Sequence, residues 1–559
     1  MWKSKKWLSW ILPGLVLILG VGLSLKLQIY SRNGVFFSTD AGLKALLTQQ
    51  LSTGQWQIAL DIPRPPWVLT LWRQGLYPFA PPYAYEQQGN YFITFPFTFS
   101  ALTAPFYALM GYSGLYVVPL VSLWVIWGRF WHVCQVWRLR SRITALSLGL
   151  IILASPLTLY GAMYWEHTLA VALAFWGLSG LMLHSLSKNS SERISLNEAM
   201  VNGVCVGLSV WFRPEFSCLV AILGTMIGLS LAPPKRLPGW LRVQIPRGLS
   251  RTVVIAFAGA MVATVLGLFG TNWVFYGHLV GIRAIQLGTE SSLSWGQRVG
   301  QIGNNYGQMV VSLLRYFPAV LLGLGLPWWL RGRARRLGIM LGLVGGLFAI
   351  AVPLIASSAV STQQWGPRFY LILVPMVGLV VAAGLQNLWR FKQKRQYALA
   401  AISLVCVVGF YANIINGGLL VYRDPLTNSA SLPSNYAPIA PAITALANYD
   451  ERWVAMPHQH VAQQLWPSVQ LKTFFRTETN DAIERLAAAL ISQNEPSFLY
   501  ICNPEKPCPA PEQGALRFQM PDGNGGNTRI RVSFESLGTF GQYPFYRGAI
   551  QTSSAGPQA

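Results

Sequence analysis

Long apolar stretches recur along the first 418 residues of the chain, and they constrain its fold more than any other feature of the sequence. A helix needs roughly 20 apolar residues to cross a bilayer, so the stretches predict about eleven transmembrane helices. Only 11% of the residues are charged, whereas a soluble globular protein carries roughly 25%. The first stretch runs from Leu8 to about Leu27, and the others span approximately 112–134, 143–162, 167–186, 199–212, 216–232, 252–274, 309–330, 337–358, 369–389 and 397–418.

Basic residues between the stretches predict how the chain is threaded through the bilayer. The clusters at 138–142, 235–247, 331–336 and 390–395 all share one side with the lysines of the N-terminus when the stretches are joined in order. Basic loops are retained in the cytoplasm. We therefore expect an inner (plasma) membrane protein with a cytoplasmic N-terminus and an extracytoplasmic, periplasmic C-terminal segment. The basic cytoplasmic loops also explain the net charge of +23. Because no basic run belongs to a recognisable nucleic-acid-binding motif, we expect no nucleic-acid partner.

Acidic residues divide the chain into two parts. Eight of the 19 precede residue 419, and the other eleven lie from Asp424 onward. We therefore expect a transmembrane domain over 1–420, with a long first outer loop at 30–111, followed by a separate domain over 421–559. Strand patterns at 453–456, 497–501 and 529–534 and a helix pattern at 479–491 predict a small α/β domain. The fold class is then a polytopic α-helical membrane protein with a small C-terminal α/β domain outside the membrane.

The first outer loop has its own local patterns. Asp40 precedes a predicted amphipathic helix over Ala41–Leu51, for which Thr39 or Asp40 is a suitable cap. Alternating aromatic residues around Gly89 and Asn90 predict a β-hairpin. The apolar, proline-interrupted segment at 96–110 is expected to lie along the membrane interface.

The sparse acids of the membrane region gather on one face under this threading. Only Glu192 and Glu198 fall inside. Part of this bias follows from the retention of basic residues in the cytoplasm, and the rest suggests a site on the outer face. The six outer acids are Asp40, Asp61, Glu86, Glu166, Glu215 and Glu290.

Cysteines and histidines indicate a disulfide rather than a metal site. Cys502 and Cys508 flank a five-residue loop in the domain expected outside, where an oxidising compartment permits a disulfide; two separate thiols are the alternative. His458 and His460 have the spacing of a metal pair, but no third ligand follows at a suitable distance. We therefore expect a surface loop there and no metal ligands.

Several outer-face motifs together resemble those of one enzyme family. In their order and placement, the motifs over residues 1–420 resemble those of the GT-C superfamily, integral-membrane glycosyltransferases that use polyprenyl-phosphate sugars. The resemblance is to the bacterial protein-mannosyltransferase and aminoarabinose-transferase type. The motifs are Ser38-Thr39-Asp40, Ser155-Pro156 to Tyr160 with Tyr164-Trp165-Glu166-His167, Phe212-Arg213-Pro214-Glu215, Asn272 with Tyr276-Gly277-His278, and Trp365-Gly366-Pro367-Arg368-Phe369-Tyr370.

This resemblance implies a membrane glycosyltransferase that moves a sugar from a polyprenyl-phosphate donor to an extracytoplasmic lipid, glycan or protein acceptor, with inversion. The acceptor hydroxyl must lose its proton as it attacks, so Asp40 is the expected catalytic base; a helix cap is its alternative role. The leaving phosphate requires cations. Arg213 and Arg368 are expected at outer helix ends, where they either bind that phosphate or snorkel to the interface. Arg64 is a further candidate cation in the loop.

Two other acids are expected to contact substrate. Glu166 and His167 either bind the sugar or acceptor, or cap the following helix. Glu86 lies among Tyr83, Tyr85 and Tyr91, which either stack on a sugar or anchor the interface. A doubled Asp-Glu after the first span is missing, which is a departure from the family pattern. An Asp-x-Asp motif is missing as well, so no cofactor is expected, and a divalent metal, although compatible, is not indicated.

Two other classes of function remain open. A transporter or flippase would carry ionisable groups at mid-membrane within broken helices, often in two related halves. In this chain the acids gather at one face, and the two halves of the membrane region do not match. A non-catalytic scaffold for envelope assembly would use the C-terminal domain for docking. Substitution of Asp40 by alanine distinguishes a transferase from these alternatives, because it abolishes turnover in a transferase but leaves a scaffold's assembly intact.

Overall fold

A computed structural model describes most of the chain. The described residues are 4–28, 34–36, 40–185, 194–231, 250–285, 294–326, 330, 332–356, 366–389, 391–419, 436–504, 506–521 and 527–554. Four residues of the predicted motifs and outer acids, together with the basic cluster at 235–247, lie outside these ranges. The four are Ser38, Thr39, Glu290 and Trp365.

The chain divides into two compact units. One comprises residues 1–30 and 115–421, and the other comprises residues 31–114 and 422–559. The sequence placed the loop at 30–111 in the membrane domain, whereas the structure groups this segment with the C-terminal region. Each unit is described by itself.

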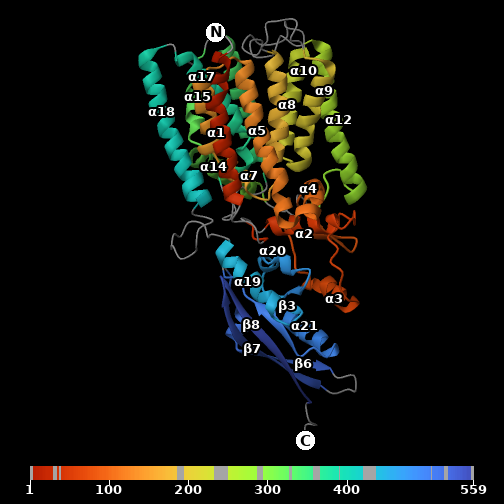
Figure 1. Cartoon of the computed structure of the whole chain (residues 1–559). Helices are drawn as coiled ribbons and strands as arrows, with labels where there is room; N and C mark the ends of the chain where they lie inside the picture. The colour runs from red at the N-terminus through yellow and green to blue at the C-terminus, as the bar shows by residue number, and fades with distance from the viewer. Residues whose placement is uncertain are drawn as a thin grey trace. The chain divides into compact units, whose positions relative to one another are not determined.

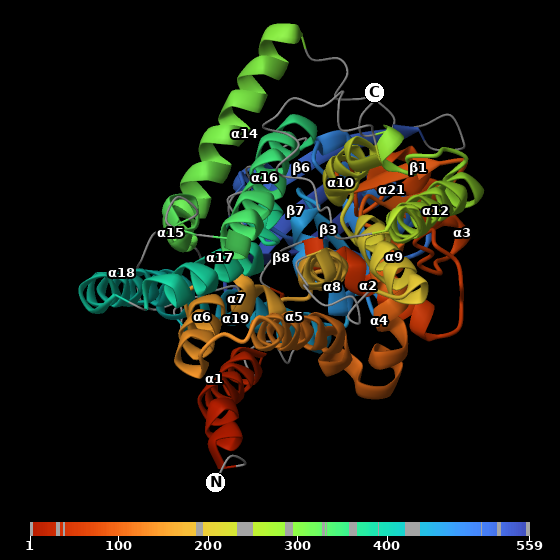
Figure 2. The same ribbon diagram turned by 90° about the horizontal axis from the view of Figure 1, so that it is seen from above.

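The first unit is a bundle of helices that run side by side (Figures 1 and 2). The helix α9 packs against α8 and α12, α8 packs against α5, and α6 packs against α1 and α17. The helices are α1 (Ser4–Gln28), α5 (Val117–Val136), α6 (Ser141–Leu153), α7 (Leu157–Gly161), α8 (His167–Ser185), α9 (Leu196–Phe212), α10 (Phe216–Leu231), α12 (Arg251–Tyr276), α14 (Trp295–Tyr316), α15 (Ala319–Gly325), α16 (Gly332–Ile355), the 3-10 turn η7 (Arg368–Tyr370), α17 (Leu373–Leu388) and α18 (Lys392–Phe410), which continues as a π-helical segment, η8 (Tyr411–Leu419).

The bundle is that of a multi-span membrane protein. Each predicted apolar stretch overlaps at least one helix, and the stretch at 143–162 contains two, α6 and α7. By length and composition, five described helical segments are long and apolar enough to cross a membrane, and a bent pair makes a sixth. Five further apolar helices of this unit are shorter than a typical span, namely Ser141–Leu153, His167–Leu183, Leu196–Phe212, Phe216–Leu229 and Leu373–Leu388.

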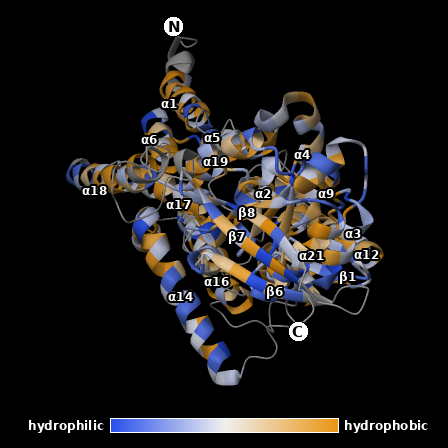
Figure 3. Ribbon diagram, turned by 90° about the horizontal axis from the view of Figure 1, so that it is seen from below, coloured by the Kyte–Doolittle hydropathy of each residue, from blue (hydrophilic) through white to orange (hydrophobic). Residues whose placement is uncertain are grey.

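The predicted span at 309–330 is not one straight helix. The helix α14 begins earlier, at Trp295, and α15 leaves it at an angle of 100°. Phe317 and Pro318 separate the two helices, and a proline without an amide hydrogen cannot continue the hydrogen-bond ladder of a helix. Hydrophilic and hydrophobic bands alternate along α14 (Figure 3), because its first half is rich in Gln and Asn.

In the second unit the C-terminal region forms a six-stranded mixed sheet with order β4-β3-β5-β8-β7-β6. The strand β3 is parallel to β4 and β5, and the remaining pairs are antiparallel. The predicted strands and helix of this region are confirmed, and Thr479 caps α21 as expected. The elements are α19 (Tyr436–Asn448), β3 (Trp453–Met456), α20 (His460–Gln464), the 3-10 turn η9 (Trp466–Ser468), β4 (Thr473–Arg476), α21 (Asn480–Ser492), β5 (Ser497–Ile501), α22 (Pro509–Glu512), β6 (Ala515–Pro521), β7 (Asn527–Phe540) and β8 (Tyr543–Ser554).

The loop segment adds a hairpin and several helices to this unit. The strands β1 (Ala84–Gln87) and β2 (Asn90–Ile93) pair antiparallel around a turn at Gln88 and Gly89. Both turn residues have positive φ angles, of 53° and 78°, as a two-residue hairpin of type I′ requires. The helices are α2 (Asp40–Ser52), α3 (Pro66–Leu71), a short π turn, η2 (Trp72–Leu76), and α4 (Phe97–Met110).

The helix α2 does not expose the polar face that its sequence pattern predicted. Ten of its residues are buried, including Lys44, Thr48 and Gln50. It packs against α4 on one side and against α20 and η9 on another. The sequence pattern predicted one exposed face, but the α4 segment and the C-terminal region, which are distant in sequence, both cover this helix.

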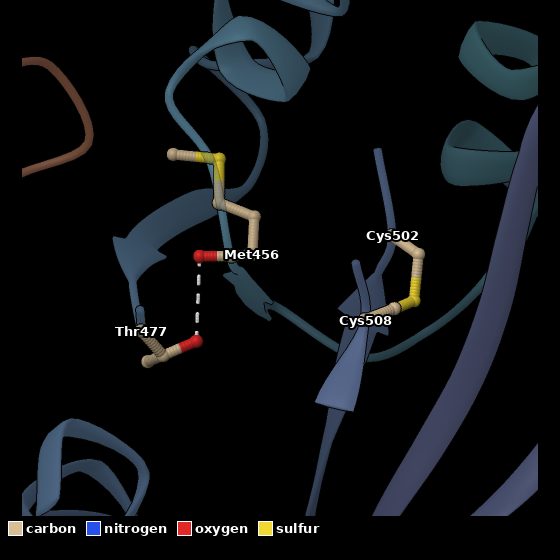
Figure 4. Close-up of a disulfide and its surroundings, with 4 residues drawn as sticks. All are labelled: Met456, Thr477, Cys502 and Cys508. Carbon is tan, nitrogen blue, oxygen red and sulfur yellow. Dashed lines mark hydrogen bonds between the residues drawn. A yellow bond between two sulfur atoms is a disulfide. The ribbon is translucent and has the colours of Figure 1, made fainter. Parts of the chain in front are cut away.

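A disulfide joins Cys502 and Cys508 near the end of β5 (Figure 4). The same view shows the Thr477 hydroxyl donating to the Met456 carbonyl, at 3.4 Å, beside β3. The disulfide closes the loop between β5 and α22. The other four cysteines are free thiols in the helical unit.

Candidate functional site

An ion network at the ends of three helices is the central feature of the helical unit. The Arg213 Nε donates to Glu215 Oε1 at 2.6 Å, and its Nη1 donates to Glu166 Oε1 at 3.1 Å. Arg213 follows the last residue of α9, Glu215 precedes the first residue of α10, and Glu166 precedes the first residue of α8. All three side chains are buried, with Glu166 only 1% exposed. One guanidinium therefore holds two carboxylates in a place with little access to water.

The local sequence explains why these ends meet. Pro214 cannot donate to a helical ladder, so α9 stops at Phe212 and the chain turns before α10. Arg213 adopts an extended conformation there, with φ −140° and ψ 104°. The backbone amide of Phe216 donates to the Arg213 carbonyl at 3.0 Å and closes the turn. A buried charge is tolerated only with a partner, and the two carboxylates supply it.

Aromatic rings lie beside this network. The rings of Tyr160, Trp165 and His167 have centroids between 5.0 and 5.3 Å apart in each pair. All three are buried. The Tyr164 ring lies 6.5 Å from that of Tyr116. The segment 160–167 thus contributes a cluster of buried aromatic rings on either side of Glu166 in the sequence.

Arg368 meets the network through a single ring. Its Cζ lies 4.5 Å from the centroid of Phe369, and the Cζ of Arg213 lies 5.4 Å from the same ring. Both guanidinium groups are close enough for their charges to act on Tyr160. Gly366 has a positive φ of 63°, a conformation that favours glycine, and it lies in ordinary contact range of Pro156.

The structure thus brings together four predicted residues from distant motifs. These four are Glu166, His167, Arg213 and Arg368. Glu215 and Phe369, which join them, are not among the predicted site residues. Both residues stand in the motifs of the sequence, Glu215 in 212–215 and Phe369 in 365–370, and this position is the signal that marks them.

Asp40 belongs to the other unit. It is the first residue of α2 and is half-buried. Lys44, one helical turn later, is 2% exposed and was not predicted as a site residue. Its Nζ lies 4.9 Å from the centre of the Phe95 ring. Residues four apart share one face of a helix, so the acidic side chain of Asp40 and the basic side chain of Lys44 lie on the same side of α2.

Arg64 contacts backbone carbonyls, and its role in binding substrate stays a prediction. Its Nη2 donates to the carbonyls of Val469 and Lys472, the latter at 3.0 Å, and its Nη1 donates to Pro63 at 2.7 Å. Burial lowers the pKa of this guanidinium. The side chain connects the loop to the turn before β4, because its two terminal nitrogens donate to backbone carbonyls.

Glu86 is exposed on β1, directly opposite Tyr91 on β2. The Tyr91 ring stacks on Tyr77 with centroids 3.5 Å apart. Burial, with a smaller effect of the Glu86 charge, raises the pKa of Tyr91 to about 12. Tyr85 is buried as well. The tyrosines therefore pack within the loop segment, and one face of Tyr91 is already covered.

Metal ligands do not cluster in the part of the chain that the structure describes. The rings of His458 and His460 lie 4.3 Å apart, and His460 also contacts Tyr83. Burial, together with the charges of His458 and Lys506, lowers the pKa of His460 to about 4. The surface loop expected here ends before His460, which is half-buried at the first position of α20.

Comparisons with known proteins identify the fold. No protein-family model matches the chain, and no curated protein matches its sequence. The crystal structure of ArnT from Cupriavidus metallidurans bound to undecaprenyl phosphate matches with a TM-score of 0.53 at 10% identity, over 95% of this chain and 97% of that one. The apo form of the same protein matches with a TM-score of 0.51 at 11% identity, over the same shares of the two chains.

A third match is weaker. The archaeal oligosaccharyltransferase AglB from Archaeoglobus fulgidus has a TM-score of 0.47 at 11% identity, over 94% of this chain and 74% of that one, and we base no argument on it. The match to ArnT spans nearly the whole of both chains, including the C-terminal region. This chain therefore shares the fold of the ArnT structure.

Proposed function

We propose that the protein is a membrane glycosyltransferase that moves a sugar from a polyprenyl-phosphate donor to an extracytoplasmic lipid, glycan or protein acceptor, with inversion. One observation carries the proposal: four residues from three separate motifs meet around the Arg213 network and the Phe369 ring. The shared fold supports it, because the ArnT structure binds undecaprenyl phosphate.

In the proposed reaction Asp40 is the general base. The acceptor oxygen attacks the anomeric carbon, and its proton passes to the Asp40 carboxylate. The bond between the anomeric carbon and the phosphate oxygen breaks, so its electron pair leaves with the polyprenyl phosphate. The half-buried position of Asp40 at the start of α2 supports this role, because the carboxylate retains access to a substrate.

Arg368 is the proposed phosphate ligand. A guanidinium can contact a phosphate through two parallel hydrogen bonds, and charge that develops on the leaving group is stabilised best by a cation fixed in advance. The Phe369 ring beneath the Arg368 guanidinium fixes it in this way. Arg213 is a weaker candidate for the same role, because Glu166 and Glu215 already occupy two of its nitrogens.

Arg213 is instead proposed to position Glu166. The Arg213 Nη1 lies 3.1 Å from the Glu166 Oε1. In the sequence, Glu166 stands between Trp165 and His167. A sugar presents hydroxyl groups and an apolar ring face, which a fixed carboxylate and aromatic rings can both contact. Glu166 and His167 are therefore proposed to bind the sugar or the acceptor. Exposed Glu86 is a further candidate for acceptor contact.

The proposed site requires the outer side of the inner membrane. We propose a cytoplasmic N-terminus and an extracytoplasmic location for both the loop at 30–111 and the C-terminal region. The disulfide between Cys502 and Cys508 supports this orientation, because disulfides persist in oxidising compartments. A reporter fused after Ala559 should be active outside the cytoplasm, and cytoplasmic activity alone would contradict both the orientation and the site.

Lipid analysis of a deletion strain tests the function. A strain that lacks the protein should accumulate a polyprenyl-phosphate sugar, and the wild-type gene should remove it. Asp40→Asn should not, since loss of a general base typically costs roughly 10²–10⁴-fold in rate. Asp61→Asn is the matched control, because it makes the same change at an exposed acid of the same segment to which no role in the reaction is assigned. If Asp40→Asn clears the donor as well as the wild type does, the catalytic assignment is wrong.

A further inference from the structure

Trp466 connects the C-terminal region to the chain that leads into α2. Its side chain is completely buried, and its Nε1 donates to the Gly34 carbonyl at 2.6 Å. The ring stacks on Phe36 with a centroid distance of 5.5 Å, and Tyr112 meets it edge-on at the same distance. One tryptophan therefore contacts both the beginning and the end of the loop segment that carries Asp40.

Two glycines allow this close packing. Gly34 has a positive φ of 72°, and a Cβ there would lie 2.8 Å from Pro467. Gly42, two positions after Asp40, lies so close to α20 that a Cβ would overlap the carbonyl of Gln463 and lie 3.3 Å from the Trp466 Cβ. The backbone is thus fixed six positions before Asp40 and again two positions after it.

Other contacts join the rest of the loop segment to the C-terminal region. The Gln459 side chain accepts from the amide of Ala80 at 2.6 Å. The Trp72 Nε1 donates to the carbonyl of Phe474 at 3.2 Å. These contacts hold the segment as a whole, whereas those of Trp466 and Gln463 lie next to the start of α2. The position of Asp40 therefore depends on the C-terminal region more directly than on the hairpin or α3.

We propose that the C-terminal region is part of the catalytic centre, with Trp466 and Gly42 as positioning residues that hold the start of α2 and so fix Asp40. The inference rests on the proposed function, because it takes Asp40 as the base. It gives the C-terminal region a role in the reaction itself, in place of the separate docking role that a scaffold would require. General acid–base catalysis needs the base within hydrogen-bond reach of the acceptor, and a misplacement of 1 Å can reduce the rate about 10²-fold.

Hydrogen exchange on the full-length protein in detergent tests the positioning step without any substrate. Trp466→Phe keeps the stacking but removes the hydrogen bond to Gly34, and Gly42→Ala forces α2 away from Gln463. In both variants, amides of α2 should exchange roughly tenfold faster or more, while β5 and the helices α8 and α9 exchange as in the wild type. Tyr500→Phe is the matched control, since it removes a polar atom from a buried ring within the C-terminal sheet. Unchanged exchange in α2 overturns the proposal.

The activity arm uses the accumulation of lipid-linked donor in the deletion strain. Gly42→Ala and Trp466→Leu should accumulate donor as Asp40→Asn does, and Trp466→Phe should restore part of the activity. Clearance of the donor by both Gly42→Ala and Trp466→Leu overturns the positioning role, provided that Asp40→Asn accumulates it. If Asp40→Asn clears the donor, the proposed base is wrong while the exchange arm still decides whether Trp466 fixes α2. Faster exchange across β5 as well would show that Trp466 only stabilises the fold, and it too overturns the proposal.

Discussion

Replacement of Arg213 by methionine should destabilise the helical unit strongly. The substitution leaves Glu166 and Glu215 buried without the guanidinium that both now contact, at 3.1 and 2.6 Å. Methionine fills much of the same volume, so the main effect is the loss of charge rather than a cavity. The local formal charge changes from −1 to −2 in a region where water is nearly excluded.

The size of the effect follows from the burial of the two carboxylates. Glu166 is 1% exposed and Glu215 is 6% exposed, so neither can regain the solvation it has in an unfolded chain. Removal of one partner from a buried ion pair typically costs about 3–5 kcal/mol, because an uncompensated charge remains. Replacement of the whole network by uncharged groups should cost far less, since the desolvation of all three ions is then avoided.

The free energy of unfolding at pH 7 in detergent provides the assay. Arg213→Met should lose about 3–5 kcal/mol, and the triple variant with Glu166→Gln and Glu215→Gln should recover most of that loss. Arg142→Met is the control, because that exposed arginine of a basic loop should change stability by less than about 0.5 kcal/mol. The reasoning is refuted if Arg213→Met is no less stable than the Arg142 variant, or if the triple variant shows no recovery.

Three further predictions concern single groups. The His460 imidazole should stay neutral down to about pH 4, whereas the unfolded chain takes up this proton near pH 6.5. The free energy of unfolding should therefore fall by up to about 3 kcal/mol as the pH is lowered from about 6.5 to about 4. A titration of the labelled histidines, with His460→Gln to assign the signal, measures this pKa. Non-reduced peptides should show Cys502 bonded to Cys508 by mass spectrometry, and two free thiols would contradict this. Arg368→Ala should weaken the binding of undecaprenyl phosphate roughly tenfold or more, since a hydrogen bond to a charged group contributes about 1.5–3 kcal/mol; unchanged affinity would exclude the phosphate contact.

Local patterns predicted much of the fold because they depend on neighbouring residues. The β-hairpin at Gln88 and Gly89 follows from alternating side chains and from a glycine that accepts a positive φ. The cap at Thr479 follows from its own hydroxyl, which accepts from the amide three residues later. The apolar stretches likewise place the helices of the bundle. In each case the interactions that form the element lie within a few residues of one another.

Contacts between distant segments account for the differences. The helix α2 has the pattern of a helix with one exposed face, yet α4 and α20 cover it, and neither could be paired with α2 from the spacing of its residues. The break in the span at 309–330 is the exception, because Pro318 interrupts the helix locally. The grouping of residues 31–114 with the C-terminal region depends on contacts such as that between Trp466 and Gly34, which are more than 400 positions apart.

The candidate cations show the same limit in their chemistry. From the sequence, Arg64, Arg213 and Arg368 are three equivalent donors for a phosphate, because residue type alone gives each the same charge. The structure distinguishes them by their burial and, for Arg64 and Arg213, by the acceptors that their nitrogens contact. Arg64 donates to backbone carbonyls and Arg213 donates to two carboxylates, and a phosphate would have to displace these acceptors in a buried setting, where each lost hydrogen bond costs about 1–3 kcal/mol. Arg368 is half-exposed with its guanidinium over the Phe369 ring, whereas Arg213 is only 7% exposed, so a phosphate can approach Arg368 from solvent without breaking the Arg213 network. A phosphate that binds in the helical unit should therefore select Arg368 and leave the Arg213 network intact.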